Sequence, residues 1–120
     1  CVLQQYGCTE RVSLHGVVQD FRSRLPNMDC FLLTSRRESF SRVAVEVALA
    51  SVPLVAPRIP GLDEVTEGGR YCETFAVGDA RGAAAAIRRV IADYSSALEL
   101  AQEARARALE TYSPPAVAAR

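Results

Sequence analysis

The chain has 120 residues, 49% of them hydrophobic and 23% charged, which is long enough and ordinary enough for one compact soluble domain. Its 14 basic and 14 acidic side chains cancel, which excludes the basic footprint expected of a nucleic-acid binder. No apolar run approaches the roughly 20 residues of a membrane span, and the first residue is Cys1 rather than Met, so an upstream targeting segment stays open.

The first part of the chain alternates short helix-like and strand-like runs. Residues 1–8 are typical of the end of a helix, and Arg11–Val18 predicts a strand because apolar and polar residues alternate. Asp20–Met28 indicates a short helix with Asp20 as its N-cap. Cys30–Thr34 is a short apolar run, which is typical of a strand buried on both faces of a parallel sheet.

The remaining segments continue this alternation. An apolar helix surrounds Glu46, and a strand over Leu54–Ala56 follows. A single helical turn is expected over Glu64–Gly68 and a weaker strand over Tyr71–Val77. Residues 80–120 contain 14 alanines, which favours two closing helices, and the expected stop is a Ser-Pro-Pro run. These helices cover Ala83–Tyr94 and Ala97–Tyr112, and the stop is Ser113–Pro115.

Strands that alternate with helices at this spacing predict an α/β fold with a mainly parallel sheet. Ligands bind such sheets at the carboxyl ends of the strands. The loop Thr34–Ser41 follows one strand and leads into the apolar helix, whose N-terminus favours phosphate. The pattern therefore predicts a phosphate or nucleotide site, with Glu38 at its mouth and Glu46 two turns further along the helix.

Glu46 is the most informative residue of this helix because seven apolar residues surround it. A lone ionised carboxylate is costly to desolvate, so Glu46 must reach solvent, hold a cation or face a ligand. The simplest structural alternative is an ion pair with Arg42, four residues earlier, and for Glu38 it is a solvated loop position. We favour a ligand contact for both carboxylates.

The cysteines do not indicate a metal site. They form no CxxC pair and are not clustered with His15, the single histidine. We expect free thiols in a reducing compartment, with Cys30 inside a buried strand. The four cysteines are Cys1, Cys8, Cys30 and Cys72.

Glu38–Glu46 resembles the E-x7-E motif of glycosyltransferase family 4, a family of retaining enzymes with the two-domain GT-B fold. The flanking segments resemble further motifs of that family in the same order, over about residues 5–112. These segments are Val12–Gly16 (the strand and glycine of the donor-base pocket), Met28–Ser35 ("aDvfvlPS"), Glu46–Ala56 ("EAmAxGxPVVa"), Pro60–Val65 ("GGxxEiv") and Gly69–Asp79 (the tail ending in "pgD").

This resemblance implies a Rossmann-like parallel sheet flanked by helices and ending in Ala-rich helices. Residues 1–120 would form a single partial domain, the C-terminal donor-binding domain, with the N-terminal acceptor domain absent. The function implied is transfer of a hexosyl-type sugar, with retention, from a nucleotide diphosphate sugar to an acceptor. The resemblance does not decide whether that acceptor is a saccharide, a lipid or a small molecule. We expect the isolated chain to be inactive.

The resemblance also implies a cytoplasmic protein that needs no cofactor or metal, because basic residues and a helix dipole commonly replace the metal. Partners would be the donor and the acceptor, without nucleic acid or a transmembrane segment. Peripheral membrane association of the full protein stays open.

By the same resemblance Glu38 is the catalytic residue and accepts hydrogen bonds from hydroxyls of the transferred sugar. Glu46 would bind the ribose diol, since a carboxylate has two acceptor oxygens. Backbone N–H groups of Phe40 and Ser41 would face the sugar or diphosphate, and Val43 the ribose or base. The implied donor-binding residues are Gly16, Ser39, Phe40, Ser41, Val43 and Glu46.

The sequence departs from the family pattern where glycine is usual. Ser41, Ser51, Pro60 and Cys72 stand at such positions. These departures motivate the alternative function, a degenerate non-catalytic module that binds a nucleotide or a partner.

Overall fold

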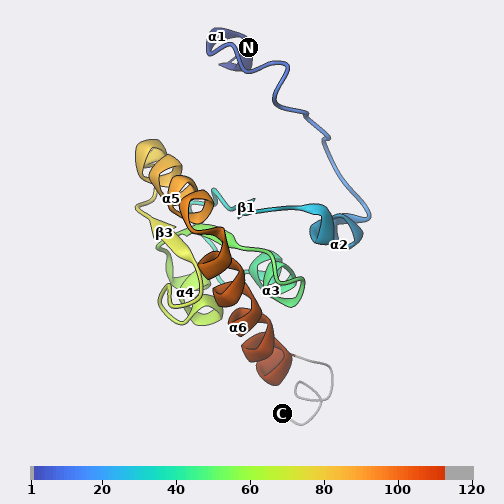
Figure 1. Ribbon diagram of the computed structural model, residues 1–120, viewed down its shortest axis with the longest axis vertical. Coiled ribbons are helices and arrows are strands. Elements are labelled where there is room, and N and C mark those ends of the chain that lie inside the picture. Colours follow the sequence, from blue (N-terminus) through green and yellow to red (C-terminus); the bar gives the residue numbers. More distant parts are fainter. Residues whose placement is uncertain (1, 113–120) are drawn as a thin grey trace.

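The computed structural model describes residues 2–112. It has three layers, with a small parallel sheet between two layers of helices (Figure 1). The strands lie in the order β1-β2-β3, and both pairs are parallel, with Phe31 opposite Leu54 and Val55 opposite Glu73. This confirms the predicted α/β class. The strands are β1 (Phe31–Leu32), β2 (Leu54–Pro57) and β3 (Glu73–Phe75).

Helices cover both faces of the sheet, and α6 runs along α3 and the end of α5 (Figure 1). The two closing Ala-rich helices are confirmed as α5 and α6, each beginning three residues earlier than predicted. Cys1 and the predicted stop at Ser113–Pro115 lie outside the described residues. The helices are α1 (Val2–Gln5), α2 (Phe21–Arg24), the 3₁₀ turn η1 (Leu25–Asn27), α3 (Arg42–Leu49), α4 (Pro60–Thr66), α5 (Ala80–Ala92) and α6 (Tyr94–Tyr112).

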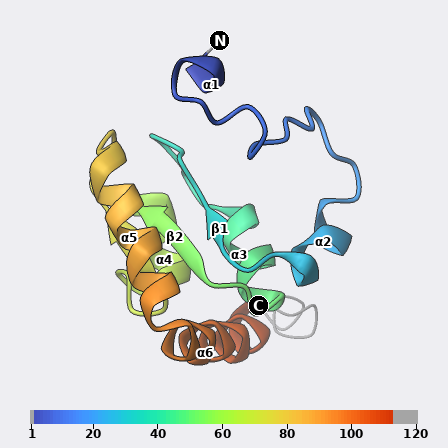
Figure 2. The same ribbon diagram turned by 45° about the horizontal axis from the view of Figure 1, so that its top comes forward.

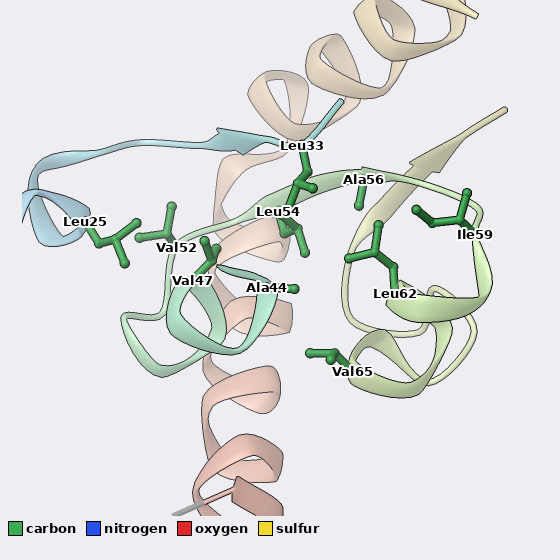
Figure 3. Packing of buried hydrophobic residues seen from close by; sticks show 10 residues of the cluster. All are labelled: Leu25, Leu33, Ala44, Val47, Val52, Leu54, Ala56, Ile59, Leu62 and Val65. Atoms are coloured by element: carbon green, nitrogen blue, oxygen red, sulfur yellow. The ribbon is translucent and has the colours of Figure 1, made fainter. Parts of the chain in front are cut away.

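Strand β2 is the centre of the core because neighbouring strands flank it and helices cover both of its faces. Leu54 and Ala56 point into the core formed with α3 and α4 (Figure 3). Val55 faces the opposite side and packs with Phe75 and with the small residues of α5, among them Ala86. This alternation is the two-residue period of a strand, here apolar on both faces.

The predicted strand over Arg11–Val18 is wrong. The structure has no strand there, and Leu14 and Val17 are 82% and 96% exposed. In Figure 1 and Figure 2 the chain between α1 and α2 runs apart from the sheet. A strand needs hydrogen-bonding neighbours and an apolar surface to cover, and this segment meets neither condition.

Because residues 11–18 form no strand, β1 has a different place in the sheet from the one predicted. Within residues 2–112, β1 pairs only with β2 and is therefore an edge strand. Phe31 is half-buried and Leu32 is exposed, so the prediction of burial on both faces is wrong. Cys30, predicted inside that strand, is half-buried and precedes it. Burial raises the pKa of its thiol, with a smaller contribution from the charge of Asp29.

Two helix starts also differ from the prediction. Asp20 precedes α2 as expected, but its side chain caps no backbone N–H and instead accepts from the Ser23 hydroxyl. The helix changes to a 3₁₀ turn at Leu25–Asn27, where Pro26 has no N–H to donate. Helix α4 begins at Pro60 rather than Glu64, because proline suits the first position of a helix.

Helix α3 ends in a Schellman motif. The Val52 N–H donates to the Val47 carbonyl at 3.3 Å, and the Ser51 N–H donates to the Ala48 carbonyl at 3.0 Å. Ser51 has a φ of 57°, in the left-handed region that favours glycine. The side chains of Val47 and Val52 both lie in the core, which supplies the apolar contact usual for this motif. The geometry thus explains why the family usually has glycine at Ser51.

No helix within residues 2–112 is long and apolar enough to span a bilayer.

Candidate functional site

The loop between β1 and α3 lies at the carboxyl edge of the sheet, as predicted. It ends at Ser41, whose side-chain oxygen accepts a hydrogen bond from the Ala44 N–H at 3.1 Å and caps α3. Ser41 is buried and has a φ of −97°, which every L-residue adopts easily. The backbone therefore does not need the family's usual glycine here, and the hydroxyl is directed into the helix end.

Glu38 is held within this loop. Its side chain is half-buried, and the Ser35 hydroxyl donates to its Oε1 at 2.9 Å. Glu38 is thus anchored and not a fully solvated loop carboxylate. Its position before the capped end of α3 fits an acceptor for hydroxyl donors, because the helix N-terminus supports a negative charge.

The structure shows how the Glu46 carboxylate is accommodated among its apolar neighbours. Its side chain is 23% exposed, and the Nε of Arg22 donates to its Oε1 at 3.0 Å. The cation is thus Arg22 from α2 and not Arg42, the alternative partner considered from sequence. The Arg22 side chain is 81% exposed, and such a surface ion pair contributes about 0–1 kcal/mol.

A hollow of about 660 Å³ lies beside Glu46, between α2, α3 and the end of α6. Its wall is mainly apolar, with the Glu46 carboxylate and two arginines among the lining side chains. The rings of Phe40 and Tyr112 meet edge to face at its border, with centroids 5.6 Å apart. It is lined by Arg22, Leu25, Pro26, Phe40, Arg42, Val45, Glu46, Leu49, Ala50 and Tyr112.

The structure brings together only part of the predicted donor-binding set. Phe40 and Glu46 line the hollow, and Ser41 begins the helix that forms its wall. Ser39 is exposed and Val43 packs partly against the core; neither lines the hollow. Gly16 lies in the irregular segment that runs apart from the sheet, with a φ of +64°.

One backbone N–H of the predicted site already has a partner within the protein. The Ser41 N–H, expected to face the nucleotide sugar, donates to the Gly61 carbonyl at 3.2 Å. Sequence reasoning missed this contact and also missed Arg22 and Leu25 as neighbours of Glu46. Arg22 lies 24 residues from Glu46, and no motif joins them, so the sequence carries no signal for this pair.

Within the described part of the chain, no three His, Cys, Asp or Glu side chains gather to hold a metal ion. Glu46 offers a hydrogen-bond acceptor to hydroxyls beside an apolar wall and two guanidinium groups. Glu38 offers a second carboxylate from the preceding loop, but it is not among the residues that line the hollow.

Comparisons with known proteins identify the family of the chain. The family "Glycosyl transferases group 1" matches residues 2–93. Glycogen synthase of Mycobacterium tuberculosis is 40% identical over 83 residues, which cover 69% of this chain and 20% of that enzyme. The lipopolysaccharide core biosynthesis glycosyltransferase LpsE of Rhizobium meliloti is 29% identical over 111 residues, which cover 92% of this chain and 33% of LpsE.

A solved structure supports the same fold. The crystal structure of Anabaena Alr3699/HepE in complex with UDP-glucose superposes with a TM-score of 0.86 and 26% identity, over 98% of this chain and 34% of that protein. The chain thus spans between a fifth and a third of the length of these relatives. Sequence and structure together show that the chain belongs to the group 1 glycosyltransferases.

Proposed function

We propose that this chain is the C-terminal donor-binding part of a retaining glycosyltransferase of family 4. The protein would transfer a hexosyl-type sugar from a nucleotide diphosphate sugar to a saccharide, lipid or small-molecule acceptor. The observation that carries the proposal is the E-x7-E pair at the start of α3, with Glu38 anchored in the loop and Glu46 on the wall of the hollow. The UDP-glucose bound by the Anabaena relative supports a nucleotide-sugar donor.

Glu46 is suited to bind the ribose diol. Among the described residues only its Oε1 has an ion-pair partner, Arg22, so Oε2 is available to a hydroxyl. Because the pair with Arg22 is exposed, its replacement by two ribose hydroxyls costs little. The apolar side chains beside Glu46 would then cover the nucleoside, a combination usual for small-molecule sites.

Glu38 would accept hydrogen bonds from the transferred sugar. Its anchoring by Ser35 keeps the carboxylate in one place, so that little orientational freedom is lost when the donor binds. Arg22 and Arg42, which line the hollow beside Glu46, would attract the anionic diphosphate. This assignment requires no metal or further cofactor, and we place the reaction in the cytoplasm.

The proposal is tested by calorimetry with UDP-glucose on the full-length protein. Glu46→Gln should weaken binding about tenfold or more, because it removes a charged acceptor. Glu103→Gln, an exposed position on α6, is the control and should leave affinity unchanged. An unchanged affinity of the Glu46→Gln variant would remove Glu46 from the site.

Turnover separates the proposal from its alternative. The full-length protein should release UDP from UDP-glucose when acceptor is supplied, while residues 1–120 alone should transfer no sugar. Tight donor binding without any turnover would instead favour the non-catalytic nucleotide-binding module.

A further inference from the structure

We infer that Gly61 is a positioning residue for Glu38: the absence of a side chain at Gly61 lets the first turn of α4 hold the Glu38 backbone in place. This inference rests on the proposed function, since it assigns Gly61 a role through the proposed catalytic carboxylate. Gly61 is buried and belongs to α4, the helix that follows β2.

The two backbones are in direct contact. A Cβ added at Gly61 would lie 2.7 Å from the Cβ of Glu38, and the carbonyl carbon and oxygen of Glu38 would be closer still. None of these atoms is the far end of a flexible side chain, so the contact would be relieved only by a shift of the loop or the helix. On the other side, the Ser41 N–H donates to the Gly61 carbonyl at 3.2 Å. Gly61 therefore contacts both ends of the segment from Glu38 to the helix cap.

Conformational freedom is not the reason for glycine at this position. Gly61 is not among the residues with positive φ, so alanine could adopt the same backbone. In a helix, alanine is favoured over glycine by about 0.5–1 kcal/mol. Glycine stands here against that preference, and the close approach of Glu38 is the feature that requires it.

A displaced loop would act on the reacting sugar more than on the nucleotide. Glu38 is held at its side chain by Ser35 and at its backbone by Gly61. Glu46 lies about one turn into α3, beyond Glu38 and Ser41, the two residues whose contacts with Gly61 are described above. Misplacement of a positioning contact by about 1 Å costs about a hundredfold in rate.

The first experiment follows the loop itself in the full-length protein, by hydrogen exchange and mass spectrometry. Gly61→Ala should speed exchange in peptides that cover residues 34–41 by about tenfold or more. The matched control is Gly82→Ala, where an added Cβ would meet Asp79, the flexible side chain that caps α5. Gly82→Ala should leave exchange in residues 34–41 unchanged. Equal exchange in the wild-type and Gly61→Ala proteins overturns the inference, whatever the enzyme's activity.

The second experiment measures UDP-glucose turnover. Gly61→Ala should lower kcat about 10- to 100-fold with less than about a threefold change in KM, because the nucleotide contacts remain. In a Glu38→Ala background the same substitution should lower kcat less than about twofold, since the carboxylate that it displaces is already gone. Additive losses, or a loss confined to KM, overturn the inference.

The two experiments separate the inference from the proposed function. A full-length protein that neither binds nor turns over nucleotide sugars refutes the proposed function and, with it, a role of Gly61 in catalysis. The exchange measurement still decides whether Gly61 holds the loop. A protein that turns over UDP-glucose and shows additive losses refutes the role of Gly61 alone.

Discussion

Replacing Ser51 with glycine should stabilise the protein, because Ser51 occupies the left-handed position of the Schellman motif that ends α3. Its φ of 57° brings the Cβ of an L-residue close to the carbonyl oxygen that follows. Glycine lacks that Cβ and keeps both hydrogen bonds of the motif, since they involve only backbone atoms.

The size of the gain follows from two opposing terms. A left-handed L-residue costs about 1–2 kcal/mol, and the extra backbone entropy that glycine loses on folding costs about 0.5–1 kcal/mol. The midpoints of these two ranges differ by about 0.75 kcal/mol, so we expect a net gain of about 0.5–1 kcal/mol. In a cooperative unit of about 150–250 residues this raises Tm by about 1–4 °C.

The assay is urea unfolding of the full-length protein with Ser51→Gly and with Ser41→Gly as matched control. Both serines stand where the family usually has glycine, but Ser41 has a φ of −97° and caps α3 with its hydroxyl. Ser41→Gly should therefore lower stability by a few tenths of a kcal/mol, while Ser51→Gly raises the midpoint without changing the slope. If Ser51→Gly is neutral or destabilising, or if both variants gain equally, the reasoning from φ is refuted.

Two further predictions concern titratable groups. The guanidinium of Arg107, whose Nε lies 2.6 Å from Oε1 of Glu67, lowers the pKa of that carboxyl below its ordinary 4.5. The contact thus stabilises the fold above about pH 4.5, and this stabilisation is lost as pH falls through the lowered pKa. In urea unfolding at a series of pH values, the difference in stability between the wild-type protein and Arg107→Gln should therefore shrink as the pH is lowered. A difference that grows in acid contradicts this. Burial raises the pKa of the Cys72 thiol to about 12 from 9.0, which leaves about a thousandfold less thiolate near pH 8. Mass mapping after iodoacetamide treatment should therefore show Cys72 alkylated far more slowly than Cys8 in the native protein, with similar rates after unfolding; equal native rates would contradict the burial argument.

The segments that the sequence predicted well are those whose pattern and environment agree. Leu54–Pro57 is apolar on both faces and is the central strand, with helices on both sides. The Ala-rich C-terminal segment has high intrinsic helix propensity, and its helices formed as expected. In these segments local preference and tertiary packing favour the same structure. They can therefore be predicted without knowing which segments they pack against.

The candidate site was predictable in its chain-local part only. The loop, the helix start and the two carboxylates follow from neighbouring residues and from the E-x7-E spacing, whereas the cap that the Ser41 side chain provides was not predicted. The ion pair of Arg22 with Glu46 and the contact of Gly61 with Glu38 join residues more than 20 positions apart. Such contacts depend on how helices cross the sheet, which hydrophobic periodicity does not encode.

The Arg11–Val18 segment shows that a strand-like pattern alone is not enough to predict a strand. Its alternation is right for a strand, but alternation describes only which side chains would share a face. It does not supply the neighbouring strand or the apolar surface that would make the pairing favourable. Strand β1 shows the same limit, because its apolar run does not reveal that no further strand in the described part of the chain pairs with its outer edge.

Only some of the apolar residues around Glu46 are fully buried in the core. Seven apolar neighbours would indicate a helix buried on all sides, yet α3 buries only Ala44, Val47 and Ala48 fully. Val45, Leu49 and Ala50, from the same run, line the hollow beside Glu46, and Val45 and Ala50 also pack partly against the core. A nucleoside has an apolar base and a hydroxylated ribose, so a site for it needs an apolar wall interrupted by a hydrogen-bond acceptor. Under the proposed function, a single carboxylate in an apolar helix would supply that combination, whereas a polar helix face would bind the ribose but leave the base in contact with water.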